Sequence, residues 1–280
     1  MRIAAAVTLY NPTYEIIENL KNTVNLFDHV YIYDNSEKVG NYFETIKGFS
    51  NVTYIYHNEN KGLPIAFNYI LKEVYKTDVE YLCTLDQDSI ISLKCVKRIM
   101  NYINNNDVSD VAIVAPLPTG IKVKSRANVE KMEWVICSGS FLNLKLIKNN
   151  NILYDEAYFV DRFDVDFCMQ IRKKKLSIIR LNDIILNHRC GDEQGGHSEL
   201  RNYYMFRNRF YYNKKYYSRI IACARTLLQN LRHMRWVIEK PSKIKERLRV
   251  LIVAYIDFRK NKMGKISSES MAKIEYKNMA

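Results

Sequence analysis

Glycine is scarce in this chain, with 9 residues in 280, and the usual glycine-rich motifs are missing. The sequence contains no G-x-G-x-x-G, no G-x-x-x-x-G-K-[ST] and no G-x-S-x-G. These absences disfavour dinucleotide oxidoreductases, P-loop enzymes and serine hydrolases, which depend on those turns. A phosphorylated ligand would therefore be held by side chains and a metal ion rather than by a glycine-rich loop.

Long apolar runs are missing as well. The longest, Val250 to Ile256, has seven residues, whereas a helix that spans a bilayer needs about 20. The N-terminus has neither the long apolar stretch nor the cleavage site of a signal peptide. We therefore expect a cytoplasmic protein without a membrane-spanning segment, and the apolar start, Ile3 to Val7, indicates a first buried strand.

Cysteine is present but not in metal-binding or disulfide patterns. The 6 cysteines show no C-x-x-C spacing, and most stand among apolar neighbours. This distribution favours buried free thiols in a reducing compartment. The composition, 48% hydrophobic and 26% charged, also excludes a disordered or low-complexity chain.

The net charge of +13 is concentrated near the C-terminus. Residues 1–200 contain 23 Lys and Arg against 25 Asp and Glu, whereas residues 201–262 contain 17 against 3. Many aromatic residues are interleaved with these cations. The sequence thus predicts a body (1–200), a basic aromatic helical segment (201–262) and a polar tail (263–280).

Short β-rich runs alternate with amphipathic stretches in the first half of the chain. This alternation is typical of an α/β fold with a mostly parallel sheet flanked by helices on both faces. The expected strands are Ile3–Tyr10, His29–Asp34, Val52–His57, Tyr81–Leu85 and Val111–Ala115. The expected helices are Glu15–Phe27, Leu63–Tyr75 and Leu93–Ile103.

The pattern changes beyond Pro116, so we divide the body into two halves, 1–116 and 117–200. In the second half we expect extended structure at Glu133–Leu144 around a turn at Ser138–Ser140, extended structure at Ser177–Leu186, and a helix at Asp164–Lys175. From Leu200 onward the chain reads as a basic helical extension. One apolar stripe at helical spacing in this extension consists of Leu227, Leu231, Met234 and Ile238.

Four successive predicted strands each end in polar or acidic residues. The carboxyl ends of parallel strands meet at one edge of a sheet, where ligands of such folds bind. An aromatic side chain at this edge could stack on a nucleobase. The residues concerned are Thr8, Tyr10, Asp34, Lys61, Asp86, Gln87 and Asp88.

Asp86 and Asp88 follow a buried strand at positions i and i+2, where two carboxylates can converge on a hard divalent cation. Such an ion, Mn²⁺ or Mg²⁺, neutralises charge on a departing diphosphate. The alternative is a solvated turn, since Asp-x-Asp also occurs at Asp164 to Asp166. His188 ends a predicted strand and is a candidate third ligand, although a lone histidine is more often structural.

A second acidic cluster, Asp161, Asp164 and Asp166, opens a predicted helix. Acidic residues in a first turn favour the helix dipole, so capping accounts for one of them. Three carboxylates within six residues exceed what a cap requires. One that faces a cleft could accept a proton from an attacking hydroxyl.

In order and spacing, these residues resemble the family 2 glycosyltransferases, inverting enzymes with the GT-A fold, and most nearly their rhamnosyltransferase-like branch. The resemblance covers residues 2 to about 212. It rests on Val7–Pro12, Asp34–Ser36, Asn60–Asn68, Leu85–Asp88, Ser138–Ser140, Phe159–Cys168, His188–Asp192 and Tyr203–Arg209.

The resemblance implies roles for the matching positions. Asp164 would be the catalytic base, with Asp161 the second choice, because many relatives have a Glu where this chain has Phe163. Asp88, Asp86 and His188 would form the metal site. The donor and nucleotide pocket would be lined by Thr8, Tyr10, Asp34, Lys61, Asp86 and Gln87, and the donor sugar and acceptor would border Ser138, Gly139 and Ser140.

The implied reaction moves a sugar from a nucleotide-diphosphate donor to a saccharide or polyprenyl-linked acceptor in bacterial surface polysaccharide synthesis. The leading donor is dTDP-rhamnose, and UDP-hexoses and UDP-galactofuranose are alternatives. A sugar-1-phosphate nucleotidyltransferase is a further alternative, but such enzymes have a glycine-rich loop where this chain has Tyr10, Asn11 and Pro12.

The basic segment has three interpretations. It could lie on an anionic membrane surface, which would make the enzyme peripheral on the inner face of the cell membrane. It could instead be a solvated helical face. Nucleic-acid binding is the third, and we do not expect it, because the acidic residues at the sheet edge would repel a phosphate backbone.

Overall fold

The computed structural model describes residues 1–123, 127–188, 198–238 and 243–275. The chain divides into two compact units. The sheet unit comprises Met1–Asp155 and Asp164–Glu193, and the helical unit comprises Glu156–Phe163 and Gln194–Ala280. The backbone therefore passes between the units three times.

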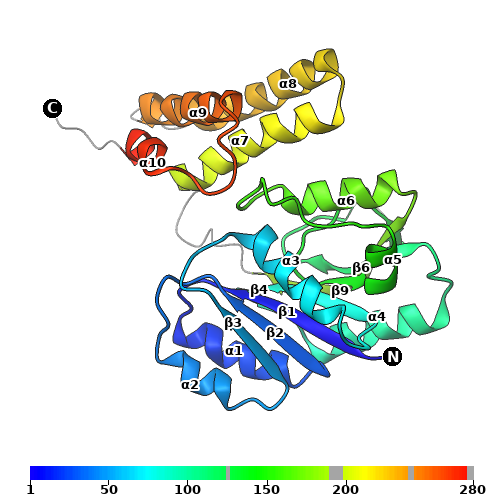
Figure 1. The fold of residues 1–280 in the computed structure, drawn as a ribbon. Coiled ribbons are helices and arrows are strands. Elements are labelled where there is room, and N and C mark those ends of the chain that lie inside the picture. The colour runs from blue at the N-terminus through cyan, green and yellow to red at the C-terminus, as the bar shows by residue number, and fades with distance from the viewer. Residues whose placement is uncertain (124–126, 189–197, 239–242, 276–280) are drawn as a thin grey trace. The chain divides into compact units, whose positions relative to one another are not determined.

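The sheet unit is built on a β-sheet with helices on both faces (Figure 1). Among the described residues, nine strands join in the order β3-β2-β1-β4-β8-β6-β9-β5, and β7 pairs with β9. The strands are β1 (Ile3–Leu9), β2 (His29–Asp34), β3 (Val52–Tyr56), β4 (Tyr81–Asp86), β5 (Ser89–Ile90), β6 (Val111–Pro118), β7 (Val129–Lys131), β8 (Ser140–Asn143) and β9 (Ser177–His188). The helices of this unit are α1 (Tyr14–Val24), α2 (Tyr42–Lys47), α3 (Leu63–Val74), α4 (Leu93–Asn105), α5 (Leu144–Asn149) and α6 (Phe163–Lys173), whose first residue belongs to the helical unit.

The predicted α/β fold is confirmed. Strands β3, β2, β1 and β4 are parallel neighbours, so their carboxyl ends share one edge. The later strands are mixed, since β8 runs antiparallel to both β4 and β6, while β9 is parallel to β6. The turn expected at Ser138–Ser140 is present, since Gly139 has a φ of 78°. Of the strand-like stretch expected on both sides of it, only the part after the turn forms a strand, β8.

One hydrophobic core lies between the sheet and helices α1 and α4. Every residue of β1 is buried, as expected for a first strand between two helical layers. Ser92 caps α4 by accepting a hydrogen bond from the Cys95 N–H at 3.2 Å, and Thr13 caps α1 in the same way. The core side chains from α1, α4 and β1 include Ile17, Leu20, Val24, Val96, Ile99, Ile103, Ile3, Ala5, Val7 and Leu9.

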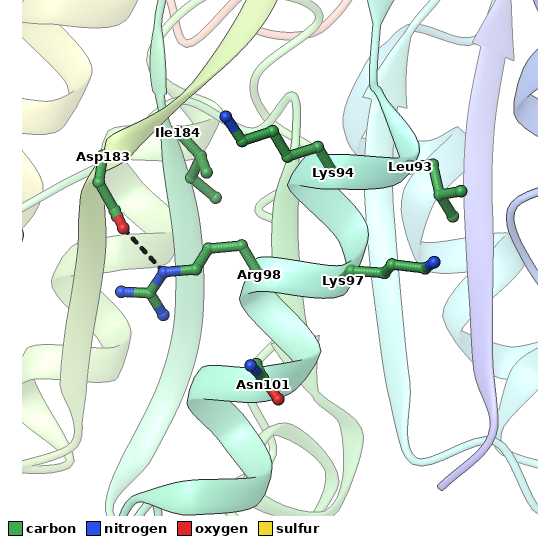
Figure 2. A pocket seen from close by; sticks show the side chains of 7 residues that line it. All are labelled: Leu93, Lys94, Lys97, Arg98, Asn101, Asp183 and Ile184. Carbon is green, nitrogen blue, oxygen red and sulfur yellow. Dashed lines mark hydrogen bonds and ion pairs between the residues drawn. The ribbon is translucent and has the colours of Figure 1, made fainter.

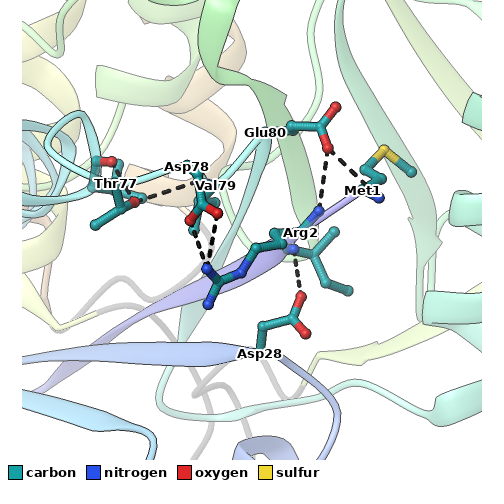
Figure 3. A network of polar contacts seen from close by, with 9 residues as sticks. Met1, Arg2, Asp28, Thr77, Asp78, Val79 and Glu80 are labelled. Carbon is teal, nitrogen blue, oxygen red and sulfur yellow. Dashed lines mark hydrogen bonds and ion pairs between the residues drawn. The ribbon is translucent and has the colours of Figure 1, made fainter.

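A polar network fixes the amino end of β1 (Figure 3). Both carboxylate oxygens of Asp78 accept hydrogen bonds from Nη1 of Arg2, at 2.7 and 2.9 Å. The Ile3 N–H donates to Asp28 at 2.8 Å. These groups lie at the end of the strand opposite to the carboxyl edge, so they stabilise the start of the sheet rather than build a site.

The helical unit contains α7 (Glu199–Tyr216), α8 (Arg219–Ile238) and α9 (Ile244–Arg259), as the basic helical extension predicts. It also contains α10 (Ser268–Glu275), which lies in the segment 263–280, where only a polar tail was predicted; its Ile274 is buried in the core of this unit. An apolar cluster joins α7 to α9, with Phe206 and Phe210 packed near Val250 and Val253. Arg207 is fully buried and donates to the carbonyl of Gly264 at 2.7 Å. No helix within the described ranges is both long enough and apolar enough to cross a bilayer.

The segment 156–163 is held by the helices of its own unit. The side-chain amide of Asn208 donates to the carbonyls of Val160 and Asp161, at 2.6 and 3.0 Å. The ring of Phe159 stacks on Tyr204 with centroids 5.2 Å apart. These contacts explain why a short segment from the middle of the chain belongs with the C-terminal helices.

Candidate active site

Parallel strand pairing aligns the predicted site residues along the carboxyl edge of the sheet. Thr8 of β1 is in register with Asp86 of β4, and Leu9 is in register with Asp34 of β2. Thr8, Asp34 and Asp86 therefore stand at the ends of three adjacent strands, where the sequence predicted them.

A cluster of metal-ligand type forms beside the end of β4. One ligand atom from each of Asp86, Asp88 and His188 lies within 4.8 Å of the others. The short strand β5 brings them together, because Ser89 pairs in register with His188 of β9. The Nδ1 atom of His188 is 3.4 Å from Oδ1 of Asp88. Residues separated by about 100 positions thus meet at one point.

Electrostatics in this cluster favour a cation. Burial, with a further contribution from the neighbouring Asp88 carboxylate, raises the pKa of Asp86 to about 7. A carboxylate pair this close is repulsive until a proton or a cation neutralises it. Two carboxylates and an imidazole also match the oxygen and nitrogen ligands that Mn²⁺ accepts. The three residues could therefore hold a divalent metal ion.

A chain of hydroxyl groups supports the cluster from behind. The Asp86 N–H donates to Oγ of Ser138 at 3.1 Å, and the Ser138 hydroxyl donates to Oγ of Ser89 at 2.6 Å. Ser89 Oγ then lies 2.7 Å from Nδ1 of His188. The hydrogen bonds of these two serines fix the orientation of the His188 imidazole, as groups around a metal ligand commonly do.

Gln87 holds the end of the first strand. Its side-chain oxygen accepts from the Tyr10 N–H at 2.8 Å, and its amide donates to the Tyr10 carbonyl at 3.2 Å. The Tyr10 side chain is 45% exposed. The aromatic ring is therefore open to a ligand while its backbone is tied to the Asp-x-Asp turn.

Asp34 is fully buried. Its Oδ2 accepts hydrogen bonds from the hydroxyls of Tyr42 and Tyr54, at 2.7 and 2.6 Å, and its Oδ1 accepts from the Ser36 N–H at 2.9 Å. These three donors satisfy a charge that would otherwise be costly to bury. Asp34 thereby organises the loop that follows β2.

Lys61 lies on the neighbouring loop that follows β3. Its N–H donates to Oδ1 of Asn35 at 3.1 Å, which joins this loop to the end of β2. Its Nζ is 4.0 Å from a carboxylate oxygen of Glu59. The loops after β2 and β3 are therefore linked by the Lys61 backbone, while its half-buried side chain lies near Glu59 of its own loop.

The turn Ser138–Ser140 packs tightly against β4 and β9. The Gly139 N–H donates to the carbonyl of Thr84 at 2.7 Å. A Cβ atom on Gly139 would come within 2.8 Å of the Leu186 side chain, and its φ of 78° also favours glycine. The conformation that presents Ser138 to the hydroxyl chain thus depends on glycine at this position.

Asp164 stands near the start of α6, in the sheet unit. Burial raises the pKa of the Cys137 thiol well above its usual value, and the negative charges of Asp86 and Asp164 add to this effect. Cys137 therefore lies within electrostatic range of both carboxylates.

Asp161 falls in the helical unit, with a left-handed φ of 57° that Arg162 shares at 65°. Its carbonyl is bound by Asn208. Asp164 and Asp161 are the two candidates for the base, and they belong to different units. Asp166, the third acid of this cluster, is buried and accepts a hydrogen bond from Gln170 at 2.8 Å.

Sequence reasoning assigned no role to Ser89, Tyr42, Tyr54 or Cys137. Tyr42 and Tyr54 are 8 and 20 residues from Asp34, and no local pattern links them to it. Ser89 directly follows the Asp-x-Asp segment, and this position next to two predicted metal ligands could have identified it from the sequence. The predicted motif runs from His188 to Asp192, and its residues 189–192 lie outside the described residues.

A separate hollow of about 600 Å³ lies beside α4 (Figure 2). Its basic side chains are Lys94, Lys97 and Arg98, and Arg98 is bound to Asp183 at 2.8 Å. Its other lining residues are Leu93, Asn101 and Ile184. None of these residues was predicted to form part of the site.

The mixed sheet with its acidic and polar carboxyl edge is an α/β arrangement shared with solved glycosyltransferases of the GT-A fold. The model of the family "Glycosyl transferase family 2" matches residues 6–178, and the chain belongs to that family. The family and fold predicted from the sequence are confirmed. The protein is thus a glycosyltransferase that uses a nucleotide-sugar donor.

Individual relatives are distant. The chain is 21% identical to the dTDP-rhamnosyl transferase RfbF of Shigella flexneri over 281 residues, which cover 91% of this chain and 94% of that protein. Its fold resembles S. aureus TarS 1–349 solved with UDP-GlcNAc, with a TM-score of 0.57, 18% identity and coverage of 98% and 84% of the two chains. It also resembles GalNAc-T7 solved with UDP, GalNAc and Mn²⁺, with a TM-score of 0.58, 12% identity and coverage of 74% and 46%.

Proposed function

We propose that this enzyme transfers L-rhamnose from dTDP-rhamnose, with inversion, to a hydroxyl of a saccharide or lipid-linked acceptor in bacterial surface polysaccharide synthesis. The observation that carries the transfer chemistry is the convergence of Asp86, Asp88 and His188 at the carboxyl edge of the sheet. The choice of rhamnose is supported by the similarity to the Shigella flexneri rhamnosyl transferase over most of both chains.

Asp88, Asp86 and His188 hold a divalent cation, Mn²⁺ or Mg²⁺, in this proposal. When bound, the ion neutralises negative charge on the diphosphate of the donor. The fit rests on the donor set and on the raised pKa of Asp86, because a cation relieves the repulsion between the two carboxylates. Ser89 and Ser138 keep His188 oriented toward the ion.

The nucleotide lies over the carboxyl ends of β1 and β2. The exposed ring of Tyr10 stacks on the base, and Gln87 fixes the backbone that carries this ring. Thr8 and Lys61 border the pocket, and buried Asp34 supports its wall through Tyr42 and Tyr54. The turn Ser138–Ser140 borders the donor sugar and the acceptor.

Asp164 is the proposed base, and Asp161 is the second candidate. The Asp164 carboxylate takes the proton of the acceptor hydroxyl as that oxygen attacks the anomeric carbon. The bond from this carbon to the diphosphate oxygen breaks, and its electron pair leaves with the nucleoside diphosphate. A single displacement of this kind inverts the anomeric configuration and needs one base.

Calorimetry with dTDP and UDP, with and without Mn²⁺, tests the donor site on the wild type and on Asp88→Asn. We expect metal-dependent binding of dTDP that the substitution weakens at least about tenfold, as loss of a charged ligand should. Absence of metal-dependent binding of either nucleotide to folded wild-type protein would refute the proposal.

A UDP-sugar donor is the second candidate. It is supported by the fold similarity to TarS, which was solved with UDP-GlcNAc. In the same titration, tighter binding of UDP than of dTDP would favour this alternative and leave the transfer chemistry intact.

A further inference from the structure

Helix α8 packs against its own unit through polar side chains. The Asn213 amide of α7 donates to Thr226 Oγ1 at 2.9 Å and to Gln229 Oε1 at 3.1 Å. Arg209 of α7 donates to the Gln229 carbonyl at 3.3 Å and contacts the His233 ring. The inner face of α8 is therefore hydrophilic, and the hydrogen bonds of these buried α7 residues hold it in place.

Six large apolar residues of α8 are exposed rather than packed against this interface. Ile220 is 83% exposed, Leu227 61% and Leu231 57%. A surface helix normally turns its apolar face inward and its polar face to water, so α8 is reversed relative to that rule. We define the α8 stripe as the exposed residues Ile220, Ile221, Leu227, Leu228, Leu231 and Ile238.

Cations border the α8 stripe. At about 3.6 residues per turn, Arg225 and Arg232 lie on one side of the helix, next to the edge of the stripe that Ile221 and Leu228 form. Both arginines are exposed. The surrounding segment, 201–262, carries 17 Lys and Arg against 3 Asp and Glu. An apolar row flanked by arginines on a strongly cationic segment is complementary to a negatively charged lipid surface.

We propose that the α8 stripe docks on an anionic phospholipid leaflet, with the leucines and isoleucines between the acyl chains and Arg225 and Arg232 at the phosphate level. The helix lies in the plane of the interface. This proposal rests on the helical unit alone and does not depend on which sugar the enzyme transfers.

Vesicle co-sedimentation of the full-length protein tests the proposal. The probes are vesicles of phosphatidylcholine alone and vesicles that also contain phosphatidylglycerol. We expect binding to the anionic vesicles, decreasing as salt is added. The double substitution Leu227→Ser with Leu231→Ser should lower the partition coefficient at least about tenfold, because two exposed leucines no longer enter the apolar layer.

The matched control is Leu93→Ser, which removes a half-exposed leucine of the sheet unit and should bind vesicles like the wild type. Should the double variant fail to fold by circular dichroism, Arg225→Gln and Arg232→Gln replace it. Each should reduce the preference for anionic vesicles by about fivefold. Metal-dependent nucleotide binding, measured without vesicles, should stay unchanged in all these variants, so a failed donor-site proposal is distinguishable from a failed docking proposal.

Three results would overturn the docking proposal. The first is absence of binding to anionic vesicles. The second is binding that the leucine substitutions leave intact, because attraction to any polyanion, including nucleic acid, would then explain it. The third is a wild-type oligomer in sedimentation equilibrium that the leucine substitutions dissociate, because the α8 stripe would then be an interface between copies of this chain.

Discussion

Nδ1 of His188 lies 2.7 Å from Oγ of Ser89, and this contact joins the end of β9 to the Asp-x-Asp segment. Removing the hydroxyl in Ser89→Ala should weaken Mn²⁺ binding roughly tenfold, because the imidazole loses the group that orients it. Calorimetric titration with Mn²⁺ measures the change, and Ser89→Thr should restore the affinity. Ser92→Ala, which removes the cap of α4, should lower the melting temperature and leave Mn²⁺ affinity unchanged.

The raised pKa of Asp86 predicts that both folding stability and metal binding depend on pH. With a folded-state pKa of about 7 against an ordinary value of 3.8, the native protein keeps this proton where the unfolded chain has lost it. The carboxyl therefore costs folding stability increasingly from about pH 4 to about pH 7, and the cost is constant above that range.

A cation must displace the Asp86 proton below pH 7. We expect the apparent Mn²⁺ affinity to fall by up to about tenfold per pH unit in that range and to level off above it. Titrations with Mn²⁺ across pH 5.5 to 8 measure this slope. In Asp86→Asn the part of the slope that comes from the Asp86 proton should disappear. A wild-type affinity that does not vary with pH would contradict the prediction.

Asp164→Asn should lower kcat roughly 100- to 10,000-fold, which is the usual contribution of a general base. Dissociation constants for the nucleotide and Mn²⁺ should change little, because Asp164 is not a member of the cluster of metal-ligand type. Single-turnover assays with the sugar donor and acceptor measure the rate. Asp161→Asn is the comparison, and a larger loss of kcat in that variant would assign the base to Asp161 instead.

Gln87→Ala should weaken nucleotide binding about fivefold, since the Tyr10 backbone loses two hydrogen bonds and each contributes about 1 kcal/mol at most. Calorimetry with dTDP in the presence of Mn²⁺ measures the change. Gln170→Ala, which removes hydrogen bonds to the Leu153 carbonyl and to the Asp166 carboxylate, is a matched control and should bind dTDP normally. Unchanged dTDP affinity in Gln87→Ala would show that Tyr10 does not contribute to the pocket.

Much of the sheet unit could be predicted from the sequence. Strands β1, β2, β3, β4 and β6 all fall where apolar and β-branched runs were found, because a buried parallel strand needs a continuous apolar segment. Parallel pairing then places Thr8, Asp34 and Asp86 at one edge without further information.

The tertiary contacts of the site could not be predicted in this way. Ser89 meets His188 only because β5 pairs with the end of β9, a register that no local pattern encodes. Periodicity indicated an apolar stripe of Leu227, Leu231, Met234 and Ile238; Leu227, Leu231 and Ile238 belong to the α8 stripe, whereas Met234 is half-buried. Periodicity could not show that the stripe is exposed, since that depends on the polar residues of α7 opposite Gln229 and His233.

The assignment of 156–163 to the helical unit has a consequence for hybrid enzymes. A chimera that exchanged the C-terminal helices with those of a relative at a single junction near residue 194 would separate Asn208 from the carbonyls of Val160 and Asp161. The segment with Asp161 would then meet foreign helices. Recombination of whole parts must therefore transplant 156–163 together with the helices, as two inserts rather than one.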